Sequence, residues 1–216
     1  MKDKALLFIN GDAPKTFPNL SDYGLVACTD GAFHYLKEGS FTLQQLDFIS
    51  GDFDSHVWEE EILQQAKDDN IEVIHTPDQE KTDFYKALEI IVEKGFKKVD
   101  VYGGSGGEQD HFLGNLTVAF GFKNQLEIKF FDEYSEYYFI PKSIELKGVQ
   151  NKIISLYPFP TVKNLNSEGL KWNLSGVDAE MASTMLTRNL ASEDKVIITY
   201  EKGALLIFVA KNKRDY

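Results

Sequence analysis

The side chains of this chain that could do chemistry are closely spaced carboxylates. Asp52 and Asp54 stand two residues apart in the segment Ser50-Gly51-Asp52-Phe53-Asp54-Ser55, so in an extended turn both can face one point. Mg²⁺ prefers hard oxygen ligands and is usually held by one or two carboxylates together with phosphate oxygens and water. The alternative is that Asp54 or Ser55 caps a following helix, but a cap does not require Asp52. We therefore expect a magnesium site at this segment.

Two further segments place an aspartate beside residues typical of a turn or a helix start. Thr29-Asp30-Gly31, taken alone, is an ordinary turn signal. In Lys81-Thr82-Asp83, Thr82 fits an N-cap and Asp83 fits a first helical turn, where the helix dipole favours a carboxylate. The functional alternative is that Asp83 is a third metal ligand and Lys81 a point charge for a phosphate.

A glycine-rich segment, Gly103-Gly104-Ser105-Gly106-Gly107, is followed by Asp110 and His111. Its glycines allow the backbone to approach a ligand closely and to offer N–H groups to phosphate oxygens. It is not a Walker loop, because no Gly-Lys-Ser/Thr follows, and Gln109 stands where the dinucleotide-binding fingerprint needs a third glycine. We expect Asp110 near the start of the next helix, and His111 more as a packing residue than as a base.

The elements that must position these segments alternate between strand and helix. Short apolar runs predict strands at residues 5–9, 24–29, 46–49, 71–75 and 98–102. Between them, helical spacing predicts helices at residues 32–38, 56–69, 82–94 and 111–122. Such alternation indicates a mostly parallel, Rossmann-like α/β sheet flanked by helices. All four polar segments follow strands or begin helices, and ligands of open α/β sheets bind at the carboxyl ends of the strands.

The pattern changes near residue 125. Runs at residues 126–131, 137–140, 143–146, 152–157, 169–173, 195–200 and 204–209 predict successive strands separated by turn signals such as Pro158-Phe159-Pro160 and Lys202-Gly203. These runs indicate a small antiparallel β-sandwich or barrel. We expect two domains, residues 1–134 and 135–216, with the boundary in the region of residues 134–142.

Composition limits the partners. The 216 residues carry a net charge of −11, which disfavours nucleic acid and anionic membranes as partners. The only arginines are Arg188 and Arg214, so a nucleotide bound to the first half must be held by metal ions, backbone N–H groups and lysines. Cys28 is the sole cysteine, and no signal peptide or membrane-length apolar stretch is present. We expect a cytoplasmic protein.

Taken together, these segments resemble the signature of the thiamine pyrophosphokinase family. The residues that carry the resemblance are Gly51-Asp52-Phe53-Asp54-Ser55, Lys81-Thr82-Asp83, the glycine segment with Asp110-His111, and Gly169-Leu170-Lys171-Trp172-Asn173-Leu174. The resemblance implies transfer of diphosphate from Mg-ATP to the thiamine hydroxyl, giving thiamine diphosphate and AMP. It also implies a homodimer with active sites between subunits.

The resemblance also implies roles for individual residues. Asp30, Asp52, Asp54, Asp83 and Asp110 would form the acidic site. Thiamine would stack on Trp172 and lie near Thr187 and Asn189. From the residues alone, Trp172 in a predicted strand is better explained as a core side chain. The sequence departs from the family pattern at Ala32, Glu108 and Arg188, where the family commonly has a glycine, an arginine and a small hydroxyl residue.

Two other functions compete with this one. A different magnesium-dependent hydrolase could use the same acidic edge without thiamine, but it has no reason to carry the segment around Trp172. A sensor could keep the pocket without catalysis, but it need not retain three metal-binding carboxylates. The residues alone do not decide whether Asp83 or Asp110 accepts the hydroxyl proton.

Overall fold

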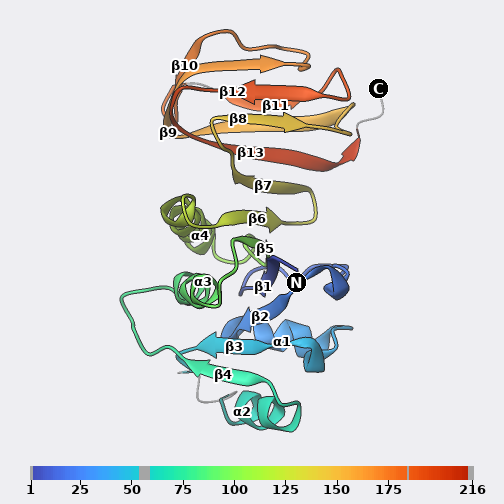
Figure 1. The fold of residues 1–216 in the computed structure, drawn as a ribbon, viewed down its shortest axis with the longest axis vertical. Helices are drawn as coiled ribbons and strands as arrows, with labels where there is room; N and C mark the ends of the chain where they lie inside the picture. Colours follow the sequence, from blue (N-terminus) through green and yellow to red (C-terminus); the bar gives the residue numbers. More distant parts are fainter. Residues whose placement is uncertain (1, 54–58, 184, 214–216) are drawn as a thin grey trace. The chain divides into compact units, whose positions relative to one another are not determined.

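The computed structural model describes residues 2–53, 59–183 and 185–213 (Figure 1). These residues divide into two compact units, Met1–Asp132 and Glu133–Tyr216. Each unit has its own hydrophobic core, so each is described separately.

The first unit is built on a parallel sheet. Its strands are β1 (Lys4–Phe8), β2 (Leu25–Thr29), β3 (Phe48–Gly51), β4 (Glu72–His75), β5 (Lys98–Tyr102) and β6 (Glu127–Phe131), hydrogen-bonded in the order β4-β3-β2-β1-β5-β6. Every pairing in this order is parallel. The predicted α/β class is confirmed. The run at residues 126–131, assigned above to the antiparallel part, is instead β6, which pairs with β5 in parallel.

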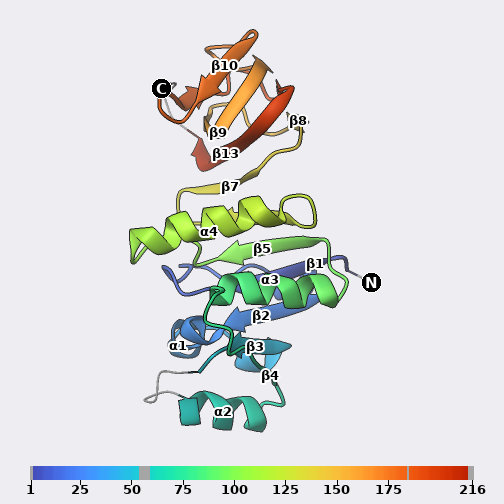
Figure 2. The ribbon, with the colours of Figure 1, turned by 90° about the vertical axis from the view of Figure 1, so that its left-hand side faces the viewer.

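Helices cover both faces of this sheet. They are α1 (Asp30–Glu38), α2 (Glu59–Asp68), α3 (Asp83–Glu93) and α4 (Gln109–Phe122), with short 3₁₀ turns η1 (Leu20–Asp22) and η2 (Leu43–Gln45). Leu6 and Phe8 of β1 belong to the same apolar cluster as α1 and α2. Because alternate strand residues face opposite sides, Ala5 and Leu7 face the other layer, where α3 and α4 lie side by side (Figure 2). No helix among the described residues is long and apolar enough to cross a membrane.

The direction of chain travel reverses beside β1. The chain passes from β1 through β2 and β3 to β4 at one edge, then returns across the sheet to β5 and continues outward to β6. The carboxyl ends of β1 and β5 therefore diverge into loops that leave in opposite directions. In open α/β sheets this is where ligands bind.

The second unit is antiparallel throughout its described pairings. Its strands are β7 (Ser135–Phe139), β8 (Ser143–Leu146), β9 (Lys152–Glu168), β10 (Val177–Glu180), β11 (Leu186–Leu190), β12 (Val196–Thr199) and β13 (Lys202–Lys213). The long strand β9 pairs with β13, β10 and β11, and its last residues pair with β12, which in turn pairs with β8. A continuous cluster of buried aliphatic side chains fills the interior. The predicted antiparallel class is confirmed.

One turn prediction and one strand prediction in this unit are wrong. The segment Pro158-Phe159-Pro160 is not a turn but part of β9, and the register with β13 shifts near it, where Leu205 pairs with Pro158. A register shift accommodates residues that cannot donate to a ladder. Residues 169–173 form a loop rather than a strand, with one bridge from Leu170 to Ala191. Strands β10 and β11 follow this loop and were not predicted.

In the first unit, a buried carboxylate on β5 connects this strand to β1. Asp100 on β5 is 4% exposed, accepts a hydrogen bond from the Tyr23 hydroxyl at 2.8 Å and lies 2.6 Å from Lys4 Nζ. We expect Asp100→Ala to lower the free energy of unfolding by about 2 kcal/mol, because two buried or half-buried polar groups lose their partner. Urea titration followed by circular dichroism measures it.

The matched control is Asp3→Ala, which removes an exposed aspartate that lies immediately before β1 and pairs with Lys98 on β5. Its urea midpoint should equal that of the wild type, because exposed ion pairs contribute little. Equal midpoints for Asp100→Ala and Asp3→Ala would show that the buried cluster does not hold the strands.

Candidate active site

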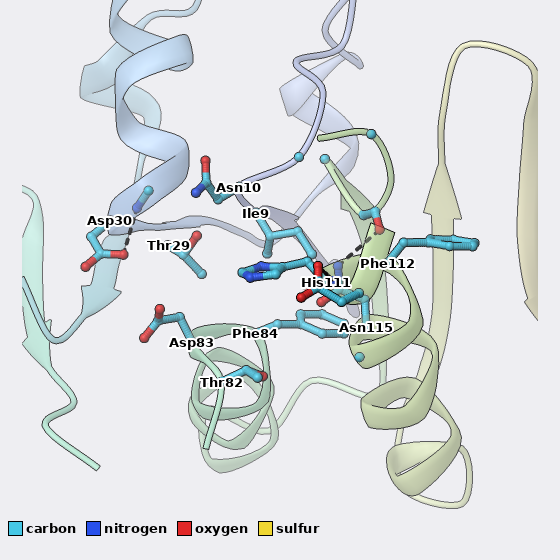
Figure 3. A pocket seen from close by; sticks show the side chains of 17 residues that line it. Ile9, Asn10, Thr29, Asp30, Thr82, Asp83, Phe84, His111, Phe112 and Asn115 are labelled. Carbon is cyan, nitrogen blue, oxygen red and sulfur yellow. Dashed lines mark hydrogen bonds between the residues drawn. The ribbon is translucent and has the colours of Figure 1, made fainter. Parts of the chain in front are cut away.

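A cavity of about 320 Å³ opens at the carboxyl ends of β1, β2 and β5. Its walls are completed by the first residues of α1, α3 and α4 (Figure 3). Six of the residues given a binding or catalytic role above line it, namely Asp30, Asp83, Asp110, Gly103, Gly104 and Gly106. Three of the four predicted segments therefore meet at this cavity.

Asp30 is the first residue of α1 and is held by the backbone on two sides. Its carboxylate accepts a hydrogen bond from Gly31 N at 2.7 Å and one from Phe53 N at 3.1 Å. Burial, followed by the charge of Asp83, raises the pKa of the Asp30 carboxyl, and Asp52 adds to this while the two backbone hydrogen bonds oppose it. The carboxylates of the site therefore repel one another across the cavity wall.

The turn that carries Asp52 is fixed against Asp30. A Cβ atom on Gly51 would overlap the Asp30 carboxylate, so only glycine fits there. Phe53 is buried, has a φ of 54° and stacks on His75 with an interplanar angle of 19°. A left-handed conformation at a bulky residue persists only where surrounding contacts impose it.

Asp52 itself lies outside the cavity lining. Its Oδ2 accepts a hydrogen bond from Gln79 Nε2 at 2.8 Å, and its carbonyl oxygen lies 3.1 Å from His75 Nε2. Its predicted partner Asp54 lies outside the described residues, together with Ser55. The metal-binding role of this pair stays a prediction.

Asp83 begins α3, as expected, and Thr82 is its N-cap, accepting from Tyr85 N at 3.2 Å. Asp83 Oδ1 is buried without a hydrogen bond of good geometry, although Lys86 Nζ lies 2.8 Å from it. Lys81 does not line the cavity. Its ammonium group contacts both carboxylate oxygens of Glu89, at 2.8 and 2.9 Å.

The glycine segment forms the wall opposite Asp30 and Asp83. Gly103 has a φ of 75°, and a Cβ atom there would overlap the carbonyl oxygen of Ile9. The end of β1 and the start of the glycine loop are therefore in direct backbone contact. Asn115 on α4 donates to the Gly104 carbonyl at 3.1 Å and fixes the loop from the other side. Ser105 and Gly107 are not among the lining residues.

Several lining residues had no functional role in the sequence-based prediction, among them Asn10, His111 and Phe84. Asn10 follows β1 and projects toward the cavity, and the ring of His111 points into it (Figure 3). Phe84 supplies an apolar wall on α3. The sequence did signal Asn10, because Asn10-Gly11-Asp12 ends the apolar run of β1 as the other polar segments end their strands.

The donor set suits magnesium in kind. It consists of hard carboxylate oxygens at the edge of the cavity, and one of them, Asp83 Oδ1, is buried without a hydrogen-bond partner. Among the described residues, however, no three carboxylate, imidazole or thiolate groups converge closely enough to form a complete metal site. A bound ion would therefore need phosphate oxygens or water as further ligands.

Trp172 belongs to the second unit and is not a core residue. It lies in the loop after β9, and 57% of its surface is exposed. The side chain of Asn189 holds its backbone on both sides, since Oδ1 accepts from Trp172 N at 3.2 Å and Nδ2 donates to Trp172 O at 2.8 Å. Lys171 Nζ lies 5.0 Å from the centre of the indole ring. The indole ring of Trp172 therefore already has the ammonium group of Lys171 beside it.

Thr187 and Arg188 precede Asn189 on β11 and differ in backbone contacts. Thr187 is exposed. Arg188, the departure from the family pattern, has a φ of 61° and donates from its backbone N–H to Ser155 Oγ at 2.9 Å. It stands where the register of β11 against β9 shifts, between Leu186 and Asn189. This bulge presents Thr187 and Arg188 to solvent while Asn189 turns toward Trp172.

Comparison with known proteins identifies similar chains over nearly the whole length. Residues 19–130 match the model "Thiamin pyrophosphokinase, catalytic domain", and residues 140–205 match "Thiamin pyrophosphokinase, vitamin B1 binding domain". The thiamine pyrophosphokinase of Bacillus subtilis is 26% identical over 214 residues, covering 94% of this chain and 97% of the relative.

Two solved structures share the fold. The thiamine pyrophosphokinase structure from Bacillus subtilis superposes with a TM-score of 0.80 at 23% identity, covering 96% of this chain and 99% of the other. That from Candida albicans superposes with a TM-score of 0.83 at 17% identity, covering 98% and 90%.

The mutual repulsion of the carboxylates gives a pH-dependent prediction. In metal-free protein, Asp30 should titrate above the usual aspartate range, and Asp83→Asn should bring its pKa part of the way back, since burial, the larger cause, remains. Because the pKa is raised in the folded state, this group favours folding less as pH rises toward the raised pKa. Carbon-13 NMR titration of the carboxyl carbons measures it.

The control for this titration is Asp3→Asn, at the opposite end of β1, which should leave the Asp30 titration unchanged. An Asp30 pKa that is identical in the wild type and in Asp83→Asn would show that the two carboxylates do not interact.

Proposed function

Because the chain belongs to the thiamin pyrophosphokinase family, we propose that its cavity binds the phosphates of Mg-ATP for diphosphate transfer to thiamine. The observation that supports this assignment best is the meeting of Asp30, Asp83, Asp110 and the glycine segment at one cavity. That cavity lies where the strand order reverses, which is the place an α/β sheet offers a nucleotide.

The reaction forms one bond and breaks one. The hydroxyl oxygen of thiamine attacks the β-phosphorus of ATP, and the bond from that phosphorus to the oxygen shared with the α-phosphorus breaks, leaving AMP. The hydroxyl proton must pass to a base. We assign that role to Asp110, which accepts one backbone hydrogen bond from His111 N at 3.0 Å, because Asp30 accepts two and Asp83 lies against Lys86.

Positioning and charge neutralisation supply most of the catalysis in phosphoryl-type transfer. Asp52, Asp54 and Asp83 would hold a magnesium ion, which when bound neutralises the charge of phosphate oxygens. Backbone N–H groups of the glycine loop and the N-terminus of α4 would face the phosphates. Lys81 could reach a phosphate only by leaving Glu89.

Thiamine is a cation with two aromatic rings, and Trp172 offers it an exposed indole face. In the proposal, Thr187 lies at the same surface and Asn189 positions the indole rather than stacking with the ligand. The cavity and Trp172 belong to different units, and we propose that a homodimer supplies both to each active site.

An assay of purified protein with Mg-ATP and thiamine tests the proposal. The expected result is equal formation of AMP and thiamine diphosphate, dependent on both magnesium and thiamine. Nucleotide turnover that continues unchanged without thiamine would instead identify a hydrolase. Thiamine binding without any turnover would identify a sensor.

Removal of the Asp52 charge tests the metal-binding turn. We expect Asp52→Asn to lower kcat by about a hundredfold or more, because charge neutralisation at the phosphates is lost. The fold should persist, since Asp52 lies in an edge turn outside the core. Steady-state kinetics and a thermal melt measure both. The control is Asp22→Asn, an exposed aspartate in η1, and near-normal turnover of a folded Asp52→Asn protein contradicts the assignment.

Intrinsic fluorescence tests the thiamine surface. Trp58 and Trp172 are the two tryptophans, so Trp58→Phe leaves Trp172 as the only indole reporter. Thiamine should quench its emission, and adding Asn189→Ala should weaken thiamine binding about tenfold, because two hydrogen bonds that hold the Trp172 backbone are lost.

The matched control for this measurement is Asn212→Ala, at an exposed position near the end of β13. It should bind thiamine as the parent does. Absence of quenching, or equal thiamine affinity with and without Asn189, would remove Trp172 or its positioning from the proposal.

A further inference from the structure

A buried lysine lies directly behind the cavity. Among the charged side chains of the described residues, only Lys86 and Asp100 are buried, and Lys86 is 5% exposed. Lys86 stands in the first turn of α3, where Phe84 and Ala87 are buried as well. An isolated ammonium group in such surroundings is strongly disfavoured unless it is fully paired.

Three oxygen atoms surround the ammonium group of Lys86. It donates to the carbonyl of Thr76 at 2.7 Å and to that of Asp78 at 3.2 Å, and it lies 2.8 Å from Asp83 Oδ1. The two carbonyl groups take two of its three N–H donors, and the Asp83 carboxylate pairs with its charge. Lys86 thus joins the loop that follows β4 to the carboxylate that begins α3.

The loop in question also reaches the second acidic position of the site. Thr76 N donates to the Gly51 carbonyl at 2.7 Å, next to Asp52 in the chain. Gln79 of the same loop donates to Asp52 Oδ2 at 2.8 Å. Displacement of the loop would therefore disturb Asp83 and the Asp52 turn at the same time.

A purely structural role does not explain the choice of lysine. Methionine has similar length, suits the apolar face of α3 and has no charge to desolvate. What methionine lacks is the charge beside Asp83 and the two hydrogen bonds to the loop. The charge of Lys86 therefore serves to orient Asp83 and to hold the loop, and not to pack the helix.

We propose that Lys86 is a positioning residue for the diphosphate transfer, acting through Asp83 and the loop of residues 76–82. It holds one oxygen of Asp83, so that the carboxylate presents a fixed orientation toward the cavity. This inference rests on the proposed function, since it assigns Asp83 a role in holding Mg-ATP. Lys86 itself, closed off from solvent, does not touch the substrate.

The test compares Lys86→Met, Lys86→Arg and a control, Lys94→Met. Lys94 is the C-cap residue of the same helix, and it pairs with Glu72 away from the cavity. We expect Lys86→Met to lower kcat at least tenfold and to require more magnesium for half-maximal activity, while the KM for thiamine changes less than twofold. Lys86→Arg, which keeps the charge, should recover part of the loss, and Lys94→Met should match the wild type.

A second measurement does not depend on turnover. Mg-ATP should raise the thermal unfolding midpoint of the wild type, and the rise should be smaller in Lys86→Met. In an Asp83→Asn background, addition of Lys86→Met should change the Mg-ATP response no further, because the two residues act as one unit. This cycle separates an effect through Asp83 from general loss of stability.

The outcomes decide between the roles. Wild-type kcat and magnesium dependence in a folded Lys86→Met protein would overturn the proposal, as would equal losses in Lys86→Met and Lys86→Arg with fully additive effects on Asp83→Asn. If Lys86→Met does not fold, Lys86→Arg and its cycle with Asp83→Asn carry the decision. Failure of the wild type to form thiamine diphosphate would refute the proposed function instead, and the Mg-ATP cycle would still report on Lys86.

Discussion

Repulsion between carboxylates at one sheet edge is the constraint that organises the first unit. Burial raises the pKa of Asp30, the charges of Asp83 and Asp52 raise it further, and no arginine stands in this half of the chain to offset them. Each carboxylate is instead held by a specific partner: backbone N–H groups for Asp30, Gln79 for Asp52 and Lys86 for Asp83. Folding therefore positions the acidic groups before any cation arrives, so that less reorganisation remains for the binding step.

Strand order does the rest of the positioning. Because β1 to β6 of the first unit run parallel, the polar segments at their carboxyl ends lie at the same edge of the sheet. The reversal of strand order beside β1 leaves room between the diverging loops. The sequence was sufficient to predict this much, since each polar segment follows an apolar run or begins a predicted helix. It could not reveal Lys86, because a lysine on a helix is normally solvated, and burial of this one depends on carbonyl groups that the loop after β4 brings to it.

In the second unit, prediction failed where local signals were overridden by pairing. Pro158 and Pro160 are strong turn signals, yet β9 runs through them, because its partner β13 shifts register nearby. The segment around Trp172 has the alternation of a strand but forms a loop, since Asn189 pairs with the Trp172 backbone where a strand neighbour would stand. That pairing is long-range and side-chain specific, so periodicity carries no trace of it, and it leaves the indole exposed rather than in the core.

The ammonium group of Lys171 over the Trp172 ring has a consequence for selectivity. A cationic ligand arriving at that ring meets a tethered competitor, present at the high effective concentration of a neighbouring residue. The measured affinity then reflects the interaction of the ligand with the indole ring minus that of Lys171, so the positive charge of the ligand by itself adds little. Discrimination then depends on what a lysine lacks, namely a flat aromatic surface that can cover the indole, and a simple ammonium compound gains little over the protein's own side chain.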